Sequence, residues 1–83
     1  MHEYAVMQSL VEAVLETLRK RPPCFVKEVR VTVGEDSGYV VESLKAAYEV
    51  LVEGTVLLGS NLLLLPEPGT AVTLQRLVLE EEV

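Results

Sequence analysis

The first quarter of the chain carries apolar residues at intervals of three or four positions. From Glu3 to about Lys20 this spacing gathers the apolar side chains on one side and the charged ones on the other, as in an amphipathic helix. The apolar positions are Met7, Leu10, Val11, Val14 and Leu18. Pro22 and Pro23 follow, and because proline cannot continue a helix, the pattern predicts a helix that ends before them.

A shorter period appears in the stretch "FVKEVRVTVG". Val29, Val31 and Val33 alternate there with polar residues, which is the two-residue period of a strand buried on one face. Gly34 closes this predicted strand.

A second amphipathic helix is predicted after the loop "EDSG". Asp36 and Ser37 are candidate N-cap residues, because their side-chain oxygens can accept hydrogen bonds from the first N–H groups of a helix. Its apolar stripe consists of Val40, Val41, Leu44, Ala47, Tyr48 and Leu51. Gly54 is well placed to end it.

Two more strands are expected near the end of the chain, over Leu62 to Leu65 and from about Thr70 to Leu79. The sequence "PEPG" between them is strong turn chemistry, so we expect an antiparallel hairpin. The fold class is therefore α+β, in the order helix-strand-helix-strand-strand, with two helices packed on one face of a three-stranded mixed sheet. The mixed character follows because a strand-helix-strand crossover makes the first two strands parallel.

The run "NLLLL" places leucine on both faces of its strand, because successive side chains point in opposite directions. The helices can cover only one face. An uncovered apolar face or edge in a small protein usually meets another chain, so a homodimer is expected.

Composition narrows the function classes. Apolar residues make up 49% of the 83, which argues against disorder. Thirteen acidic against seven basic residues give a net charge of -6, so nucleic acid is not an expected partner. No signal sequence and no membrane-length apolar run is seen, and a single cysteine forms no internal disulfide, so a cytoplasmic protein with no membrane partner is expected.

The sequence shows no arrangement typical of an enzyme: no glycine-rich phosphate loop, no nucleophile elbow and no paired cysteine and histidine ligands. We therefore expect a protein that is not an enzyme. No zinc is expected either, because Cys24 and one histidine cannot supply the four ligands of a structural site.

The single histidine, His2, lies immediately before the first helix. The Met1 amine, the His2 amide nitrogen and its imidazole Nδ1 can close two chelate rings around one metal ion, and the Glu3 amide can add a nitrogen. Such a nitrogen-rich planar set suits Ni(II) or Cu(II). The other interpretation is an ordinary solvated histidine on a frayed terminus.

Three stretches together resemble one known family. "MHEYAVMQSL", "VRVTVGEDSGYVVESLKAAYEVLVEGT" and "GSNLLLL" are similar to the N-terminal nickel-binding domain of the HypA/HybF family, the metallochaperones of [NiFe]-hydrogenase maturation. The resemblance implies that residues 1–83 form a single HypA-like nickel-binding domain. It also implies that Met1, His2 and Glu3 hold Ni(II), and that the partners are a nickel-handling maturation GTPase and the hydrogenase large subunit.

Two departures from the family stand out. Members normally carry a zinc module between the last two strands, where this sequence has only "PEPG". Some relatives also place an acidic nickel contact where this chain has Val40, and Glu35, Asp36 or Glu42 are candidate replacements. The alternative function is therefore a metal-free protein-interaction or regulatory module derived from the same fold.

Overall fold

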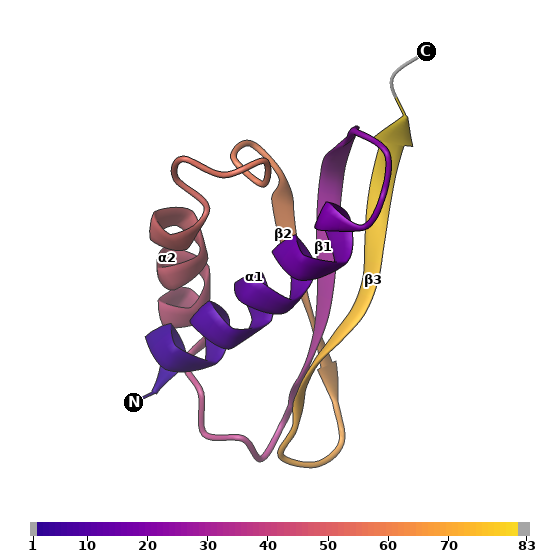
Figure 1. Cartoon of the computed structure of the whole chain (residues 1–83). Helices are drawn as coiled ribbons and strands as arrows, with labels where there is room; N and C mark the ends of the chain where they lie inside the picture. The colour runs from indigo at the N-terminus through magenta and orange to yellow at the C-terminus, as the bar shows by residue number, and fades with distance from the viewer. Residues whose placement is uncertain (1, 82–83) are drawn as a thin grey trace.

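The computed structural model describes residues 2–81 and shows two helices beside a three-stranded sheet (Figure 1). In chain order the elements are α1 (Glu3–Arg19), β1 (Cys24–Gly34), α2 (Val41–Leu51), β2 (Asn61–Glu67) and β3 (Val72–Glu81). The predicted fold class and element order are confirmed. The sheet is mixed, because β1 pairs parallel with β2 and antiparallel with β3.

The predicted hairpin between the last two strands is wrong. The strand order is β2-β1-β3, so β1 lies in the centre and separates the two strands that "PEPG" connects. The turn chemistry identified a change of direction, but it carried no information about which strand would lie between the two arms. Four valines of β1 are buried, and a strand this apolar is best placed between two others.

The connection after β2 therefore crosses the end of the central strand. Backbone hydrogen bonds hold it there: the Gly34 N–H donates to the Ala71 carbonyl at 2.7 Å, and the Glu35 N–H donates to the Glu67 carbonyl at 2.8 Å. The Asp36 N–H donates to the Gly69 carbonyl at 2.9 Å. We call residues 68–71 the crossing loop.

Gly34 is required where the crossing loop passes. A Cβ atom at this position would lie 2.6 Å from the carbonyl carbon of Gly69 and 2.8 Å from Cα of Thr70, and closer still to the Gly69 oxygen. No side chain fits against backbone at those distances. Gly34 ends the strand, as predicted, and is also the residue at which β1 contacts the crossing loop.

β1 begins at Cys24, well before the alternation of buried valines starts. The alternation is interrupted near the start of the strand by a β-bulge, which changes the face of the sheet to which the side chains point. The pairing with β3 shifts register between Val26 and Glu28. An extra residue at this point turns Val26 to the same side as Val29, and both are buried. Simple alternation could not have predicted this.

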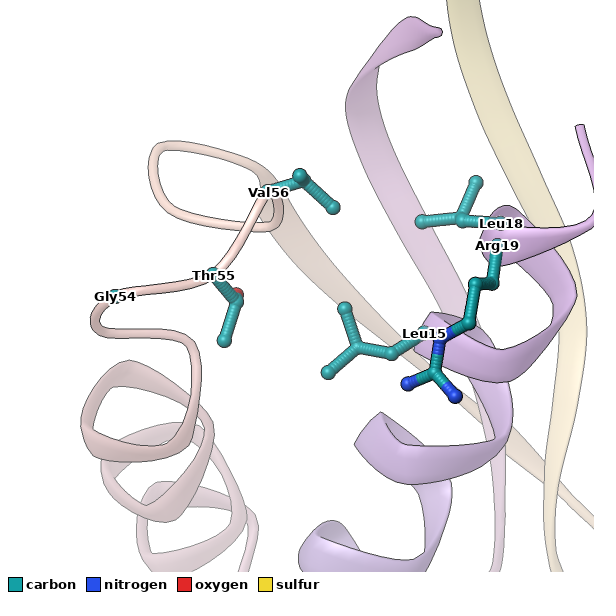
Figure 2. A pocket seen from close by; sticks show the side chains of 6 residues that line it. All are labelled: Leu15, Leu18, Arg19, Gly54, Thr55 and Val56. Atoms are coloured by element: carbon teal, nitrogen blue, oxygen red, sulfur yellow. The ribbon is translucent and has the colours of Figure 1, made fainter. Parts of the chain in front are cut away.

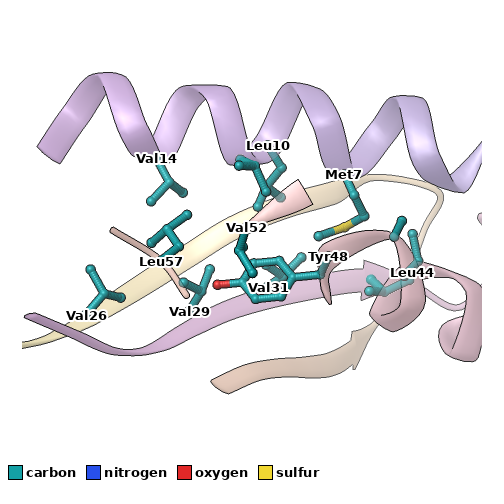
Figure 3. Packing of buried hydrophobic residues seen from close by; sticks show 13 residues of the cluster. Met7, Leu10, Val14, Val26, Val29, Val31, Leu44, Tyr48, Val52 and Leu57 are labelled. Carbon is teal, nitrogen blue, oxygen red and sulfur yellow. The ribbon is translucent and has the colours of Figure 1, made fainter. Parts of the chain in front are cut away.

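The core lies between the helices and one face of the sheet (Figure 3). Val14 of α1, Leu44 of α2 and Val29 of β1 are fully buried, and Leu57, from the loop after α2, lies between α1 and β1. Among the residues whose burial is described, all thirteen buried apolar side chains belong to one cluster. The two helices therefore share a single core on the sheet, as the amphipathic patterns predicted.

The leucines of β2 are divided between the two faces. Leu62 and Leu64 pack against the core, while Leu63 is 37% exposed on the opposite face. Beside it in register is Arg30, whose guanidinium pairs with the Glu28 carboxylate at 2.5 Å. The face of the sheet opposite the helices is thus polar along β1, and the exposed apolar side chain of Leu63 lies beside it on the edge strand β2. Pro66 is tolerated in β2 because an edge strand leaves one side of its backbone unpaired.

Candidate metal centre

His2 is the N-cap residue of α1, and its side chain takes no part in capping. Its backbone has φ −121° and ψ 30°, and its carbonyl accepts the Val6 N–H at 3.0 Å, which closes the first helical turn. No side-chain capping hydrogen bond is made at this residue, which is exposed. The imidazole is therefore not committed to holding the helix. Met1 lies outside the described residues.

The backbone donors of the predicted chelate belong to the start of this helix. No carbonyl lies one turn before His2 or Glu3, so the helical ladder does not use their N–H groups. A metal ion that replaced these amide protons would break no bond of the ladder. The observed start of α1 at Glu3 agrees with the geometry on which the chelate was predicted.

The Glu3 side chain turns inward, an orientation that the local sequence does not indicate. It is 8% exposed, and its Oε2 accepts a hydrogen bond from the Val40 N–H at 3.0 Å. Hydrogen bonds from the amino-terminal group, from Val40 and from the N–H of Glu3 itself lower the pKa of this carboxyl from 4.5 to about 2. Glu3 therefore stays ionised at any physiological pH.

The predicted caps of the second helix are wrong. α2 begins at Val41 with Val40 as its N-cap, whose side chain cannot accept a hydrogen bond. Ser37 accepts from the Tyr39 N–H instead, at 3.3 Å, before the helix starts. The carboxylate of Glu3, from the other helix, takes the place of a local cap. An apolar residue at a cap position was the only sign in the sequence, and it did not point to Glu3.

The acidic candidates for an additional ligand do not assemble into a site. The backbone N–H of Glu35 donates to the end of β2, that of Asp36 donates to the crossing loop, and Glu42 lies exposed in the first turn of α2. Within residues 2–81, no three side chains of histidine, cysteine, aspartate or glutamate converge in a way that could hold a metal ion. A metal site at the start of α1 must therefore draw mainly on backbone nitrogen and His2.

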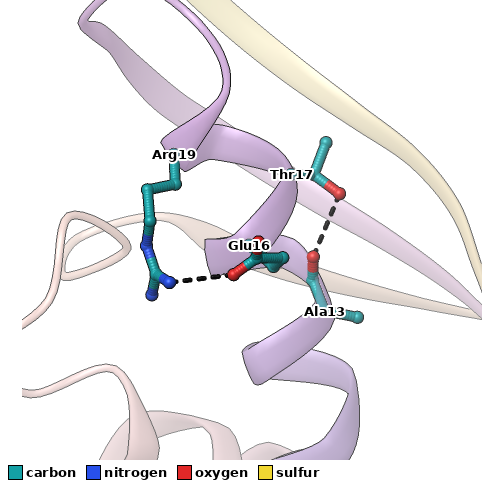
Figure 4. Close-up of polar contacts among 4 residues, drawn as sticks. All are labelled: Ala13, Glu16, Thr17 and Arg19. Atoms are coloured by element: carbon teal, nitrogen blue, oxygen red, sulfur yellow. Dashed lines mark hydrogen bonds and ion pairs between the residues drawn. The ribbon is translucent and has the colours of Figure 1, made fainter.

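The other end of α1 is built differently. A groove of about 350 Å³ lies there between the helix and the loop after α2, lined by Leu15, Leu18, Arg19, Gly54, Thr55 and Val56 (Figure 2). Arg19 pairs with Glu16 at 2.8 Å, and the Thr17 hydroxyl donates to the Ala13 carbonyl at 3.0 Å (Figure 4). These contacts finish the helix and offer no metal ligands in this part of the chain.

Comparison with known proteins identifies the family. The family described as "Hydrogenase/urease nickel incorporation, metallochaperone, hypA" matches residues 1–73. This chain belongs to the HypA family. The membership confirms the resemblance inferred from the sequence, and a metallochaperone family agrees with the expectation of a protein that is not an enzyme.

Several HypA proteins are similar in sequence. The hydrogenase maturation factor HypA of Beijerinckia indica subsp. indica is 37% identical over 71 residues, which cover 86% of this chain and 63% of the relative. HypA of Methanopyrus kandleri is 43% identical over 61 residues, which cover 74% of this chain and 43% of the relative. This chain thus spans less than two thirds of the length of these HypA relatives.

A solved HypA structure shares the fold. The solution structure of the Ni metallochaperone HypA from Helicobacter pylori matches with a TM-score of 0.69 at 24% identity, covering 92% of this chain and 72% of that one. The arrangement of helices and strands described above is therefore the fold of that HypA structure. Among the described residues, no helix is both long and apolar enough to cross a lipid bilayer.

Proposed function

We propose that this chain is a non-enzymatic nickel metallochaperone, which holds Ni(II) at its amino terminus for [NiFe]-hydrogenase maturation in the cytoplasm. Membership in the HypA family is the observation that carries the proposal. The structure adds that the imidazole of His2 is not used as a cap and is exposed at the start of a helix. The cargo is a metal ion, so what must be explained is capture and release.

Capture uses the Met1 amine, the His2 amide, the His2 Nδ1 and the Glu3 amide. Deprotonated amides are strong donors, and a planar nitrogen set suits Ni(II) and Cu(II) better than Zn(II). Cys24 has no role in this set. The His2 and Glu3 amides come from a turn whose N–H groups the helix does not need, so metallation leaves the fold intact.

Release follows from the exposed position of the site. A metal held by a few nitrogens at a surface can pass to an acceptor with more or better ligands by exchanging one ligand at a time. The partners that we propose are the nickel-handling GTPase of the maturation pathway and the hydrogenase large subunit. Both are expected to offer ligands that displace nitrogen donors at this terminus.

The proposal predicts that nickel binding needs both His2 and a free amino terminus. In calorimetric titration with Ni(II), His2→Ala should weaken binding by more than about a hundredfold. The loss should be larger than that caused by removing a residue that only hydrogen-bonds to a metal ligand, because His2 is itself a proposed ligand. Adding residues ahead of Met1 should weaken it to a similar extent, because the amine donor becomes an amide.

Gln8→Ala provides the matched control, since Gln8 is an exposed polar residue of the same helix. It should bind nickel as the unchanged protein does. If the unchanged protein shows no nickel binding, or if His2→Ala binds equally well, the metallochaperone proposal fails. The metal-free interaction module then becomes the better description of this chain.

A further inference from the structure

The carboxylate of Glu3 connects the starts of the two helices. Among the residues whose burial is described, it is the only buried charged side chain. Its Oε2 lies 3.0 Å from the backbone nitrogen of Val40, the N-cap of α2, while its own backbone forms the first residue of α1. Figure 1 shows the first turn of α1 lying beside the start of α2.

Electrostatics favours this position for a carboxylate. Each helix has partial positive charge at its N-terminus, from N–H groups that lack intrahelical acceptors. Two such ends brought together repel each other. A carboxylate between them is attracted to both, and it satisfies a donor of α2 that no local side chain reaches.

The contact also fixes the backbone that precedes it. Holding the side chain of Glu3 on α2 restricts the orientation of its backbone, and hence of the peptide that joins it to His2. The proposed amide donor of Glu3 lies in this peptide, and that of His2 lies in the peptide before it. A chelate whose donors are ordered before binding loses less conformational freedom when the metal arrives, so its affinity is higher.

We propose that Glu3 is a positioning residue for nickel: its side chain clamps the metal-binding terminus to the N-terminus of α2 and thereby raises the affinity of the chelate. This inference rests on the proposed function, because it assigns a role within the same terminus. It differs from the ligand role of Glu3, which concerns only the backbone amide. It makes α2 a part of the nickel site although α2 supplies no metal ligand.

Two substitutions break the clamp from its two sides. Glu3→Ala removes the acceptor and keeps every backbone donor of the chelate. Val40→Pro removes the N–H donor and leaves Glu3 unchanged, and the φ of −89° at Val40 lies within about 25° of the value near −65° that proline adopts. Glu3→Gln retains a side-chain oxygen that can accept from Val40.

We expect Glu3→Ala and Val40→Pro each to weaken Ni(II) binding by about ten- to a hundredfold, the usual effect of losing a group that orients a metal ligand. The double variant should bind no more weakly than Glu3→Ala alone, because Val40→Pro removes a contact that Glu3→Ala has already removed. Glu3→Gln should lose less. Glu12→Ala is the control for charge, since Glu12 is exposed on the same helix and its loss changes the net charge equally.

The readouts separate this inference from the proposed function. Loss of binding in His2→Ala tests whether nickel occupies the terminus at all. If His2→Ala abolishes binding but Glu3→Ala and Val40→Pro bind as tightly as the unchanged protein, the clamp is wrong while the metallochaperone proposal stands. Circular dichroism melting of each variant shows which are folded. If Glu3→Ala does not fold, the nickel affinity of Val40→Pro, compared with that of Glu3→Gln, decides whether the clamp contributes to binding.

Discussion

Glu3 illustrates how one residue can serve a fold and a metal site through different atoms. Its amide belongs to the predicted chelate, and its carboxylate caps the second helix. The amide nitrogen is present whatever side chain this position carries, although the carboxylate also accepts a hydrogen bond from that N–H. Replacing the side chain therefore tests one use without removing the other.

The lowered pKa of Glu3 makes a prediction about acid stability. Because the pKa falls from 4.5 to about 2 on folding, the ionised carboxylate stabilises the folded state above about pH 4.5. That contribution should disappear as the pH falls from 4.5 towards 2. Glu3→Gln lacks it at every pH, so urea unfolding should show the unchanged protein to be the more stable at pH 6, with the difference shrinking by pH 3.

Other carboxylates titrate over the same range, but they are common to both proteins and cancel in the comparison. A difference in unfolding free energy that stays constant from pH 6 to pH 3 would contradict the prediction. Circular dichroism at each pH confirms that both proteins start from the folded state.

The sequence located the candidate ligands, but it could not locate the partner of Glu3. The position of His2 before a helix follows from local patterns, and the start of α1 is where those patterns placed it. The Glu3 contact joins residues 37 positions apart, and the donor is a backbone N–H that any residue type would present. No local signal marks such a pair, so only the packing of the helices reveals it.

At the level of elements, the amphipathic stripes and the valine alternation were enough to predict both helices and the central strand. These patterns did not predict the features of the sheet that depend on how two strands pair. The bulge in β1 and the order of the strands are both set by pairing with β3, which lies far away in sequence. "PEPG" is locally a turn in either topology, so it could not distinguish a hairpin from a loop that crosses another strand.

The crossing loop predicts a large effect at Gly34. Gly34→Ala should lower the free energy of unfolding by about 3 kcal/mol, the upper end of the range for overpacking, because the new methyl group meets backbone that cannot rotate away. Urea unfolding measures the loss. Gln75→Ala, an exposed change in β3, should stay within about 0.5 kcal/mol of the unchanged protein.

If Gly34→Ala were as stable as Gln75→Ala, the crossing loop would have to lie away from β1. The strand order described here would then be wrong. The substitution therefore tests the topology as well as the packing at one residue.

The whole molecule is small for a single core, and a domain of this length buries a limited share of its surface. Its sheet ends at β2, an edge strand that carries the half-exposed Leu63. We predict a homodimer that covers this edge. Light scattering at micromolar concentration should give twice the mass of the chain, and Leu63→Lys should restore the monomer, since a lysine on an edge strand opposes further pairing.

Val50→Lys is the matched control for this prediction. Val50 is an exposed apolar residue as well, but it lies on α2, away from the sheet edge. Its replacement should leave the dimer unchanged. A protein that remains monomeric as its concentration rises would overturn the prediction.

The central position of β1 also has a consequence for the order in which the protein is completed during synthesis. The ribosome releases the terminus with the proposed nickel ligands first, and the contact between Glu3 and Val40 needs only the first half of the chain. β3, which closes one side of β1, emerges last. Until then the nascent chain presents an open strand edge, the kind of surface that chaperones protect. The segment that we propose to capture the metal can thus be in place while the sheet beside it is still incomplete.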